Sequence, residues 1–130
     1  LAAERVVELM SEVKYPYNIN VATMAIVEEL LRQPIDDKVA EIKQQREMVQ
    51  MALQNSAVVK KIYPSDANFL LVEVADADAM YDFLISRGII VRNRNRVKGC
   101  EGCLRITIGK PEENEALLKS ISEYEKSVVR

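Results

Sequence analysis

Residues 88–109, GIIVRNRNRVKGCEGCLRITIG, contain the side chains of this chain that are best suited to binding a ligand. Within LRITIG, Leu104 and Ile106 alternate as the core side of a strand would, which places Arg105 on the opposite face. Nothing in the alternation of a central strand requires an arginine there. Guanidinium groups bind carboxylates and phosphates through a planar fork of N–H donors, so Arg105 is the first candidate for an anion-binding residue.

The expected pairing of two strands brings a second arginine beside Arg105. If residues 89–93 and 103–109 form an antiparallel hairpin that turns at residues 98–99, Arg92 lies opposite Arg105. Like charges directly opposite each other destabilise a sheet, so this arrangement favours an anion bound between or above them. We therefore expect Arg92 and Arg105 to bind an anionic small molecule.

The remaining basic residues of the segment, Arg94, Arg96 and Lys98, alternate with Arg92. If the chain stays extended beyond residue 91, all four side chains project to one side. For Arg94, Arg96 and Lys98 we favour a charged, solvated strand edge that resists aggregation. Arg94 is kept as a further candidate for substrate binding.

The chemistry open to Cys100 and Cys103 is limited by what the chain lacks. A structural zinc site needs four ligands, and the sequence has two cysteines and no histidine. A redox pair favours a helix N-terminus, whereas Cys103 is expected to begin a strand. We interpret both cysteines as turn residues helped by Gly99 and Gly102, and expect no metal site. The lack of histidine also excludes Ser–His and Cys–His catalysis.

The composition of the chain limits the kinds of partner that it is expected to bind. The chain has 130 residues, 48% hydrophobic and 29% charged, which is typical of a compact folded domain. The formal net charge of −2 and the lack of aromatic residues in the basic strip argue against nucleic-acid binding. No apolar run is long enough to cross a bilayer, and no secretory signal is recognisable. We expect a cytoplasmic protein that binds neither nucleic acid nor membranes.

Hydrophobic periodicity and turn residues predict nine elements. From residue 34 their order is α-β-β-α-β-β-α, which predicts an α+β fold with helices packed on a small sheet. The expected helices are residues 2–13, 20–32, 34–55 and 78–87 and a closing helix from Pro111, and the expected strands are residues 58–63, 68–74, 89–93 and 103–109. The apolar face expected for the longest helix comprises Ile35, Val39, Ile42, Val49, Ala52 and Leu53.

Three segments, YPSDANFLLVEV, LISRGIIVRN and GCLRITIGKPEENEALLKSI, resemble the C-terminal part of the histidinol-phosphate aminotransferase family. These are fold-type I enzymes that depend on pyridoxal phosphate. LAAERVVELMSEVKYPYNIN resembles the end of that family's large domain. The resemblance therefore implies that residues 1–33 are the end of the large domain and the interdomain connection. Residues 34–130 would form the small C-terminal domain.

The resemblance also implies roles for the arginines. Arg105 would hold the substrate α-carboxylate, and Arg92 the phosphate of histidinol phosphate. Arg94 and Arg96 are extra candidates for the phosphate contact, which stays open among the three. The second substrate, 2-oxoglutarate, carries two carboxylates and suits the same pair. Such an enzyme would act in histidine biosynthesis.

Three further residues are candidates near the active site. Tyr17 and Asn18 would lie close to its mouth, although a hinge with packed tyrosines explains KYPYN equally well. Asn68 opens a strand, where an asparagine is more often a turn cap than a ligand.

In this family the Schiff-base lysine lies in a Ser-x-x-Lys segment followed by a GxRxG stretch, and this combination does not occur in the sequence. Both are expected before Leu1, so we expect no catalytic and no cofactor-binding residue in this chain. The parent protein would bind pyridoxal 5'-phosphate, include the missing N-terminal part and form a homodimer. Two alternatives stay open: an enzyme of the same superfamily acting on aromatic amino acids or another phosphorylated substrate, and a stand-alone module that binds an anionic metabolite.

Overall fold

The computed structural model describes residues 3–14 and 19–128 and divides into two compact units, Leu1–Ile35 and Asp36–Arg130. The first unit contains α1 (Glu4–Val13) and α2 (Val21–Leu31). The side chain of Asn20 caps α2 by accepting a hydrogen bond of 2.9 Å from the Thr23 N–H. The assignment of residues 1–33 to the end of a large domain and the interdomain connection stays a prediction.

The second unit has the predicted order α-β-β-α-β-β-α, and its fold class is α+β as expected. Its helices and strands are α3 (Asp36–Gln54), β1 (Val59–Ile62), β2 (Phe69–Val74), α4 (Ala77–Ser86), β3 (Arg92–Asn93), β4 (Cys103–Thr107) and α5 (Pro111–Val128). In the part of the chain that the structure describes, no helix is both long and apolar enough to cross a membrane.

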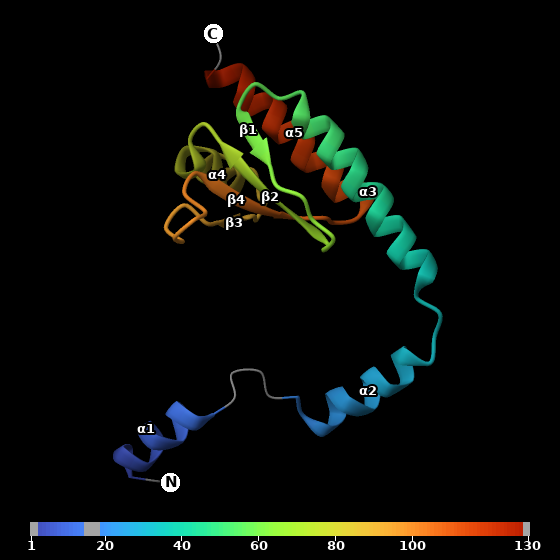
Figure 1. Ribbon diagram of the computed structural model, residues 1–130, viewed down its shortest axis with the longest axis vertical. Coiled ribbons are helices and arrows are strands. Elements are labelled where there is room, and N and C mark those ends of the chain that lie inside the picture. The colour runs from blue at the N-terminus through green and yellow to red at the C-terminus, as the bar shows by residue number, and fades with distance from the viewer. Residues whose placement is uncertain (1–2, 15–18, 129–130) are drawn as a thin grey trace. The chain divides into compact units, whose positions relative to one another are not determined.

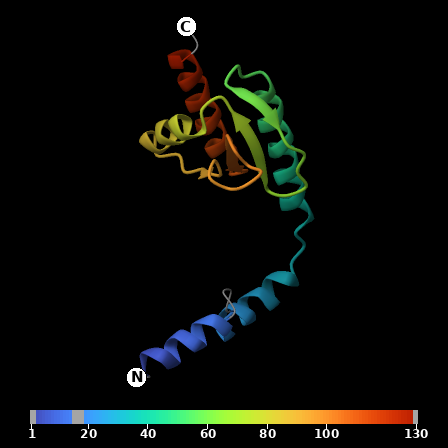
Figure 2. The same ribbon diagram turned by 60° about the vertical axis from the view of Figure 1, so that its left-hand side comes forward.

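The four strands form one antiparallel sheet in the order β1-β2-β4-β3. Side chains alternate along β2 and β4, so Leu70, Val72, Leu104 and Ile106 point to the same face and are fully buried. All three helices of this unit pack against that face, with α3 and α5 side by side (Figures 1 and 2). Their buried residues include Val49, Leu53, Met80, Leu84, Leu117 and Ile121.

Local signals explain where α4 begins and ends. Asp76 is its N-cap and accepts a hydrogen bond of 3.0 Å from the Ala79 N–H. Gly88 stops the helix in the left-handed region with φ of 75°, as a residue without Cβ does at low cost. The Ile89 N–H still donates to the Leu84 carbonyl.

Two expectations about this unit are wrong. The strand expected at residues 89–93 is reduced to Arg92–Asn93, because Ile89 is still hydrogen-bonded to the end of α4 and has not reached the sheet. The extended course considered beyond residue 91 stops at Arg94, because the Val97 N–H closes a turn onto the Arg94 carbonyl at 2.8 Å.

Only two of the six residues predicted for the apolar face of the long helix are buried in the structure, Val49 and Leu53. Ala52 is exposed, and so are Ile35, which precedes α3, and Val39 and Ile42 in its N-terminal half. The sheet therefore supports the C-terminal half of α3 alone.

We expect Leu104→Ala to lower the free energy of unfolding by about 2–5 kcal/mol, because it leaves a cavity in the core. Ile90→Ala is the matched control, since Ile90 is 83% exposed and its loss is expected to change stability by less than about 0.5 kcal/mol. Urea denaturation of the 130-residue chain measures both. Equal losses in the two variants would contradict the placement of the core.

Candidate anion-binding site

The arginines of β3 and β4 lie on one face of the sheet. Arg92 is directly opposite Arg105 in the ladder, as the hairpin centre predicted. The Arg94 N–H donates to the Cys103 carbonyl at 2.9 Å, which continues the same register. Because facing residues and alternate residues share a side, Arg92, Arg94 and Arg105 all point away from the helix-covered core. We call these three residues the arginine face.

Arg105 is held by neighbours that do not neutralise it. Its Cζ lies 5.0 Å from the ring centroid of Phe69 on β2, within the range of a cation–π contact. Leu71, its direct partner on β2, is apolar. The Nε atom of Arg105 is buried and has no hydrogen-bond partner among the described residues. Buried polar groups without partners are costly, so this donor favours an added acceptor.

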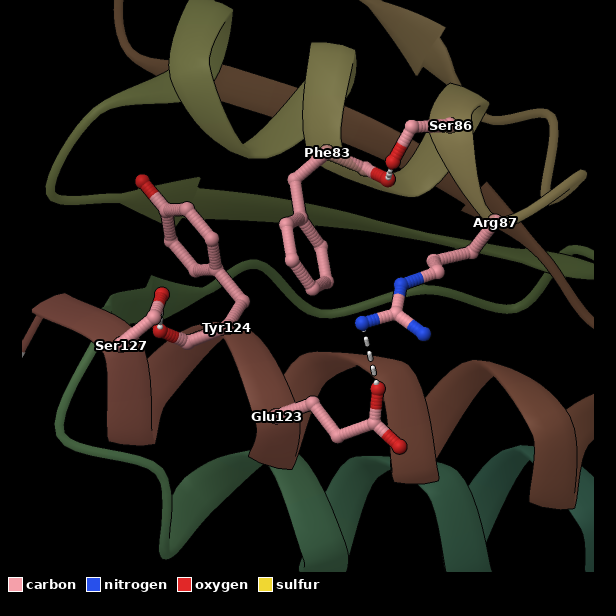
Figure 3. Close-up of polar contacts among 6 residues, drawn as sticks. All are labelled: Phe83, Ser86, Arg87, Glu123, Tyr124 and Ser127. Atoms are coloured by element: carbon pink, nitrogen blue, oxygen red, sulfur yellow. Dashed lines mark hydrogen bonds and ion pairs between the residues drawn. The ribbon is translucent and has the colours of Figure 1, made fainter.

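A second arginine that stacks on an aromatic ring, Arg87, differs from Arg105 in having an acidic partner. The Cζ of Arg87 lies 5.1 Å from the Phe83 centroid, and its Nη2 lies 3.1 Å from a carboxylate oxygen of Glu123 (Figure 3). Arg87 is thus stacked and also paired with an acid. Within residues 3–14 and 19–128, no acidic side chain forms an ion pair with any member of the arginine face.

The positive charges of the arginine face repel one another. Burial and then the charges of Arg92 and Arg94 lower the pKa of the Arg105 guanidinium. An arginine nevertheless stays protonated in proteins, so the like charges are not relieved by proton loss. An anion would relieve them, and a phosphate or carboxylate matches the geometry of guanidinium donors.

The opposite side of the edge strand is fixed by hydrogen bonds to the start of α4. The side-chain amides of Asn93 and Asn95 donate to the two carboxylate oxygens of Asp78 at 2.6 and 2.9 Å. The Asn95 carbonyl oxygen accepts from the Gly102 N–H at 2.8 Å. The hydrogen bonds from Asn93 and Asn95 lower the pKa of Asp78, with a smaller contribution from the charge of Arg96. We call Asp78, Asn93 and Asn95 the edge clamp.

The edge clamp was not identified from the sequence. The alternation of asparagine with arginine in RNRN was a signal that one side of this segment faces hydrogen-bonding partners. An open pocket of about 740 Å³, the size of many metabolite sites, lies at this edge between α4 and β3. Arg92, Arg94 and Arg96 contribute to its lining.

Among the other candidate residues, Arg96 lines the same pocket as Arg92 and Arg94, whereas Asn68 does not. Arg96 is exposed in the turn after β3. Asn68 is exposed and its backbone carbonyl accepts from the Ile108 N–H at 2.8 Å, while its side chain makes no hydrogen bond to the described residues. Tyr17 and Asn18 lie outside the residues that the structure describes.

The two cysteines flank a tight turn. The Cys103 N–H donates to the Cys100 carbonyl at 3.0 Å, and Gly102 between them has φ of 72°. Both thiols are free. Burial is the main cause that raises the pKa of Cys103, which makes it a poor nucleophile at neutral pH.

Comparison with known proteins establishes the class. The family model of aminotransferase class I and II matches residues 1–121, so the chain belongs to this family. It is 46% identical over 122 residues to a histidinol-phosphate aminotransferase from Parabacteroides distasonis, covering 92% of this chain and 35% of that protein. It is 41% identical over 126 residues to one from Christiangramia forsetii, covering 95% and 36%. The chain thus spans about a third of the length of these relatives.

Solved structures agree on the fold. The histidinol-phosphate aminotransferase from Clostridium acetobutylicum superimposes with a TM-score of 0.79 at 20% identity, over 96% of this chain and 39% of that one. L-threonine-O-3-phosphate decarboxylase from Porphyromonas gingivalis gives 0.67 at 17% identity, over 97% and 40%. The resemblance seen in the sequence motifs is therefore confirmed.

We expect Arg105→Met to raise the midpoint of urea unfolding at low salt. The change removes a charge opposite Arg92 and a buried unpaired donor, while methionine keeps the contact with Phe69. Arg87→Met, which breaks an ion pair of matched stacking geometry, is expected to lower the midpoint slightly. Added salt should shrink both effects. A lower midpoint for both variants would show that the charge of Arg105 is not unfavourable.

The edge clamp gives a pH dependence of definite sign. The pKa of Asp78 is lower in the folded chain than the ordinary aspartate value. The stabilisation that its hydrogen bonds give the fold is therefore present above the ordinary aspartate pKa, and it is lost as pH falls through the lower, folded-state pKa. The amide NMR signals of Asn95 and Gly102 should therefore keep their neutral-pH positions through the ordinary aspartate range and shift only below it. The Leu104 amide reports global unfolding in the same titration. A shift of Asn95 and Gly102 within the ordinary range would contradict the clamp.

Proposed function

We propose that this chain is the substrate-anchoring C-terminal part of an aminotransferase that transfers an amino group between histidinol phosphate and 2-oxoglutarate in histidine biosynthesis. The observation that carries the proposal is the arginine face, where Arg92 and Arg105 face each other without an acidic partner among the described residues. Relatives named histidinol-phosphate aminotransferase, 35–46% identical to this chain, support the choice of substrate.

In this proposal the two arginines bind the anionic groups of the substrates. Arg92 binds the phosphate of histidinol phosphate, with Arg94 available beside it. For 2-oxoglutarate, Arg105 binds the α-carboxylate and Arg92 the distal carboxylate. Holding a substrate at fixed points orients the carbon that reacts, which is how binding energy lowers the barrier of the chemical step. In histidinol phosphate a CH2–O–phosphate group takes the place of the α-carboxylate, so the phosphate is its only anionic group and the phosphate contact matters most.

The cofactor, pyridoxal 5'-phosphate, would supply the Schiff base and the electron sink of transamination. The residues of this chain do not fit the role of holding it. Every lysine is exposed, and Lys61 lies over the ring of Tyr63 at 4.4 Å rather than in a pocket. We propose that the Schiff-base lysine belongs to the part of the relatives that this chain does not span, and that the intact enzyme is a cytoplasmic homodimer.

A second candidate function is a stand-alone module that senses an anionic metabolite. It is favoured by the fact that the arginine face and the edge clamp are formed within Asp36–Arg130 alone. The intact protein separates the two candidates. An aminotransferase shows pyridoxal-phosphate absorbance and converts histidinol phosphate faster than tyrosine or phenylalanine, whereas a sensor binds phosphate without turnover. Faster turnover of the aromatic substrates would assign the alternative enzyme of the same superfamily.

We expect Arg105→Ala in the intact protein to lower kcat/KM for 2-oxoglutarate about 10- to 100-fold, the loss of one or two charge-assisted hydrogen bonds. Arg92→Ala should reduce kcat/KM for histidinol phosphate by a similar factor and affect an unphosphorylated amino donor much less. Arg87→Ala is the control, because Arg87 is already paired with Glu123. Equal losses for phosphorylated and unphosphorylated donors in Arg92→Ala would remove its phosphate role.

A further inference from the structure

The edge strand that carries Arg92 and Arg94 has little to hold it against β4. Its ladder contains only Arg92–Asn93, followed by the single hydrogen bond from the Arg94 N–H. Its two arginines face Arg105, so electrostatic repulsion tends to push this strand away from the sheet. Something other than the ladder must fix the position of Arg92 and Arg94.

Asp78 is placed to provide that restraint from the other side of the strand. It lies in the first turn of α4, between the buried residues Ala77 and Met80, so the helix packing fixes its backbone. Its two oxygens accept separately from Asn93 and Asn95. Since Asn93 lies between Arg92 and Arg94 in the extended part of the strand, its hydrogen bond to Asp78 directs both arginines to the opposite face.

Asn95 extends the restraint to both arms of the hairpin. Its amide donates to Asp78, and its carbonyl oxygen accepts from Gly102, the residue before β4. The Asn95 N–H also donates to the Asn93 side chain at 2.9 Å. An aspartate at position 95 would repel Asp78, and an alanine would lose all of its side-chain contacts.

We propose that Asp78 is a positioning residue that, through Asn93 and Asn95, keeps Arg92 and Arg94 beside Arg105 as a preformed site for a phosphate dianion. The proposal deepens the function proposed above and rests on it for the identity of the anion. The role is unexpected from charge alone, because a carboxylate near an anion site repels the ligand. Here both oxygens of the carboxylate accept hydrogen bonds from amides that hold the arginines in place.

Asp82 is a matched control for Asp78, because its replacement is not expected to weaken phosphate binding. It lies on the same helix, one turn beyond Asp78, and forms neither a hydrogen bond nor an ion pair with the described residues. If only charge matters, Asp78→Ala and Asp82→Ala both strengthen the binding of inorganic phosphate. If Asp78 positions the arginines, Asp78→Ala weakens binding about tenfold, whereas Asp82→Ala leaves it unchanged or slightly tighter.

The experiment is a phosphate titration of the 130-residue chain, followed by the Nε–Hε NMR signals of its arginines. Amide hydrogen exchange of residues 92–102 is measured on the same samples and should accelerate in Asp78→Ala alone. Asn95→Ala gives the same test with an intact α4 if Asp78→Ala fails to fold. Phosphate affinity and exchange rates in Asp78→Ala that match those of Asp82→Ala would overturn the proposal.

The readouts separate failure of the positioning role from failure of the proposed function. If the unmodified chain binds no phosphate, the anion-binding role of the arginine face fails. Hydrogen exchange at residues 92–102 still decides whether Asp78 holds the edge strand. If phosphate binds equally well in all variants, the anion site stands and the positioning role of Asp78 is wrong.

Discussion

The structure of the second unit depends on a pair of like charges held opposite each other in an antiparallel sheet. Arg92 and Arg105 occupy facing positions, and their repulsion works against the pairing of β3 with β4. The rest of the unit offsets this repulsion. Leu104 and Ile106, the neighbours of Arg105 along β4, are fully buried beneath the helices, which leaves β4 little freedom to move. The core thus supplies the stability that the arginine pair reduces.

Two faces of one hairpin are therefore specialised. One side presents cations without acidic partners among the described residues, and the other side binds the start of α4 through asparagine amides. The division follows from strand alternation, because adjacent residues must point to opposite sides. Under the function proposed above, this member of the aminotransferase class I and II family builds its substrate-binding surface on a strand of only two ladder residues.

The order of elements could be predicted from the sequence because each has a strong local signal, such as the cap at Asp76 and the stop at Gly88. The pairing of Arg92 with Arg105 could also be predicted, because two positions equidistant from a hairpin centre must face each other. The extended course considered beyond residue 91 does not continue past Arg94, and the turn closed by Val97 has no strong sequence signature.

The contact of Asp78 with Asn95 could not be predicted in the same way. It depends on how α4 docks on the sheet, and docking is decided by the packing of buried side chains rather than by local propensity. The burial of only half of α3 has the same origin, since the sheet is too short to cover the whole helix. Tertiary contacts of this kind decided the details of the site, while local patterns decided the order of its elements.

Leu71, the apolar partner of Arg105 on β2, has a consequence for how the site can change through mutation. An acidic residue at position 71 would lie directly opposite the guanidinium of Arg105. Its carboxylate would compete with a bound anion for that guanidinium. A single change of this kind would pair Arg105 with an internal carboxylate, as Glu123 pairs with Arg87, and would offset the repulsion between Arg105 and Arg92. Substitutions that improve folding at position 71 are therefore the ones most harmful to ligand binding. Selection for function at this position acts against selection for stability.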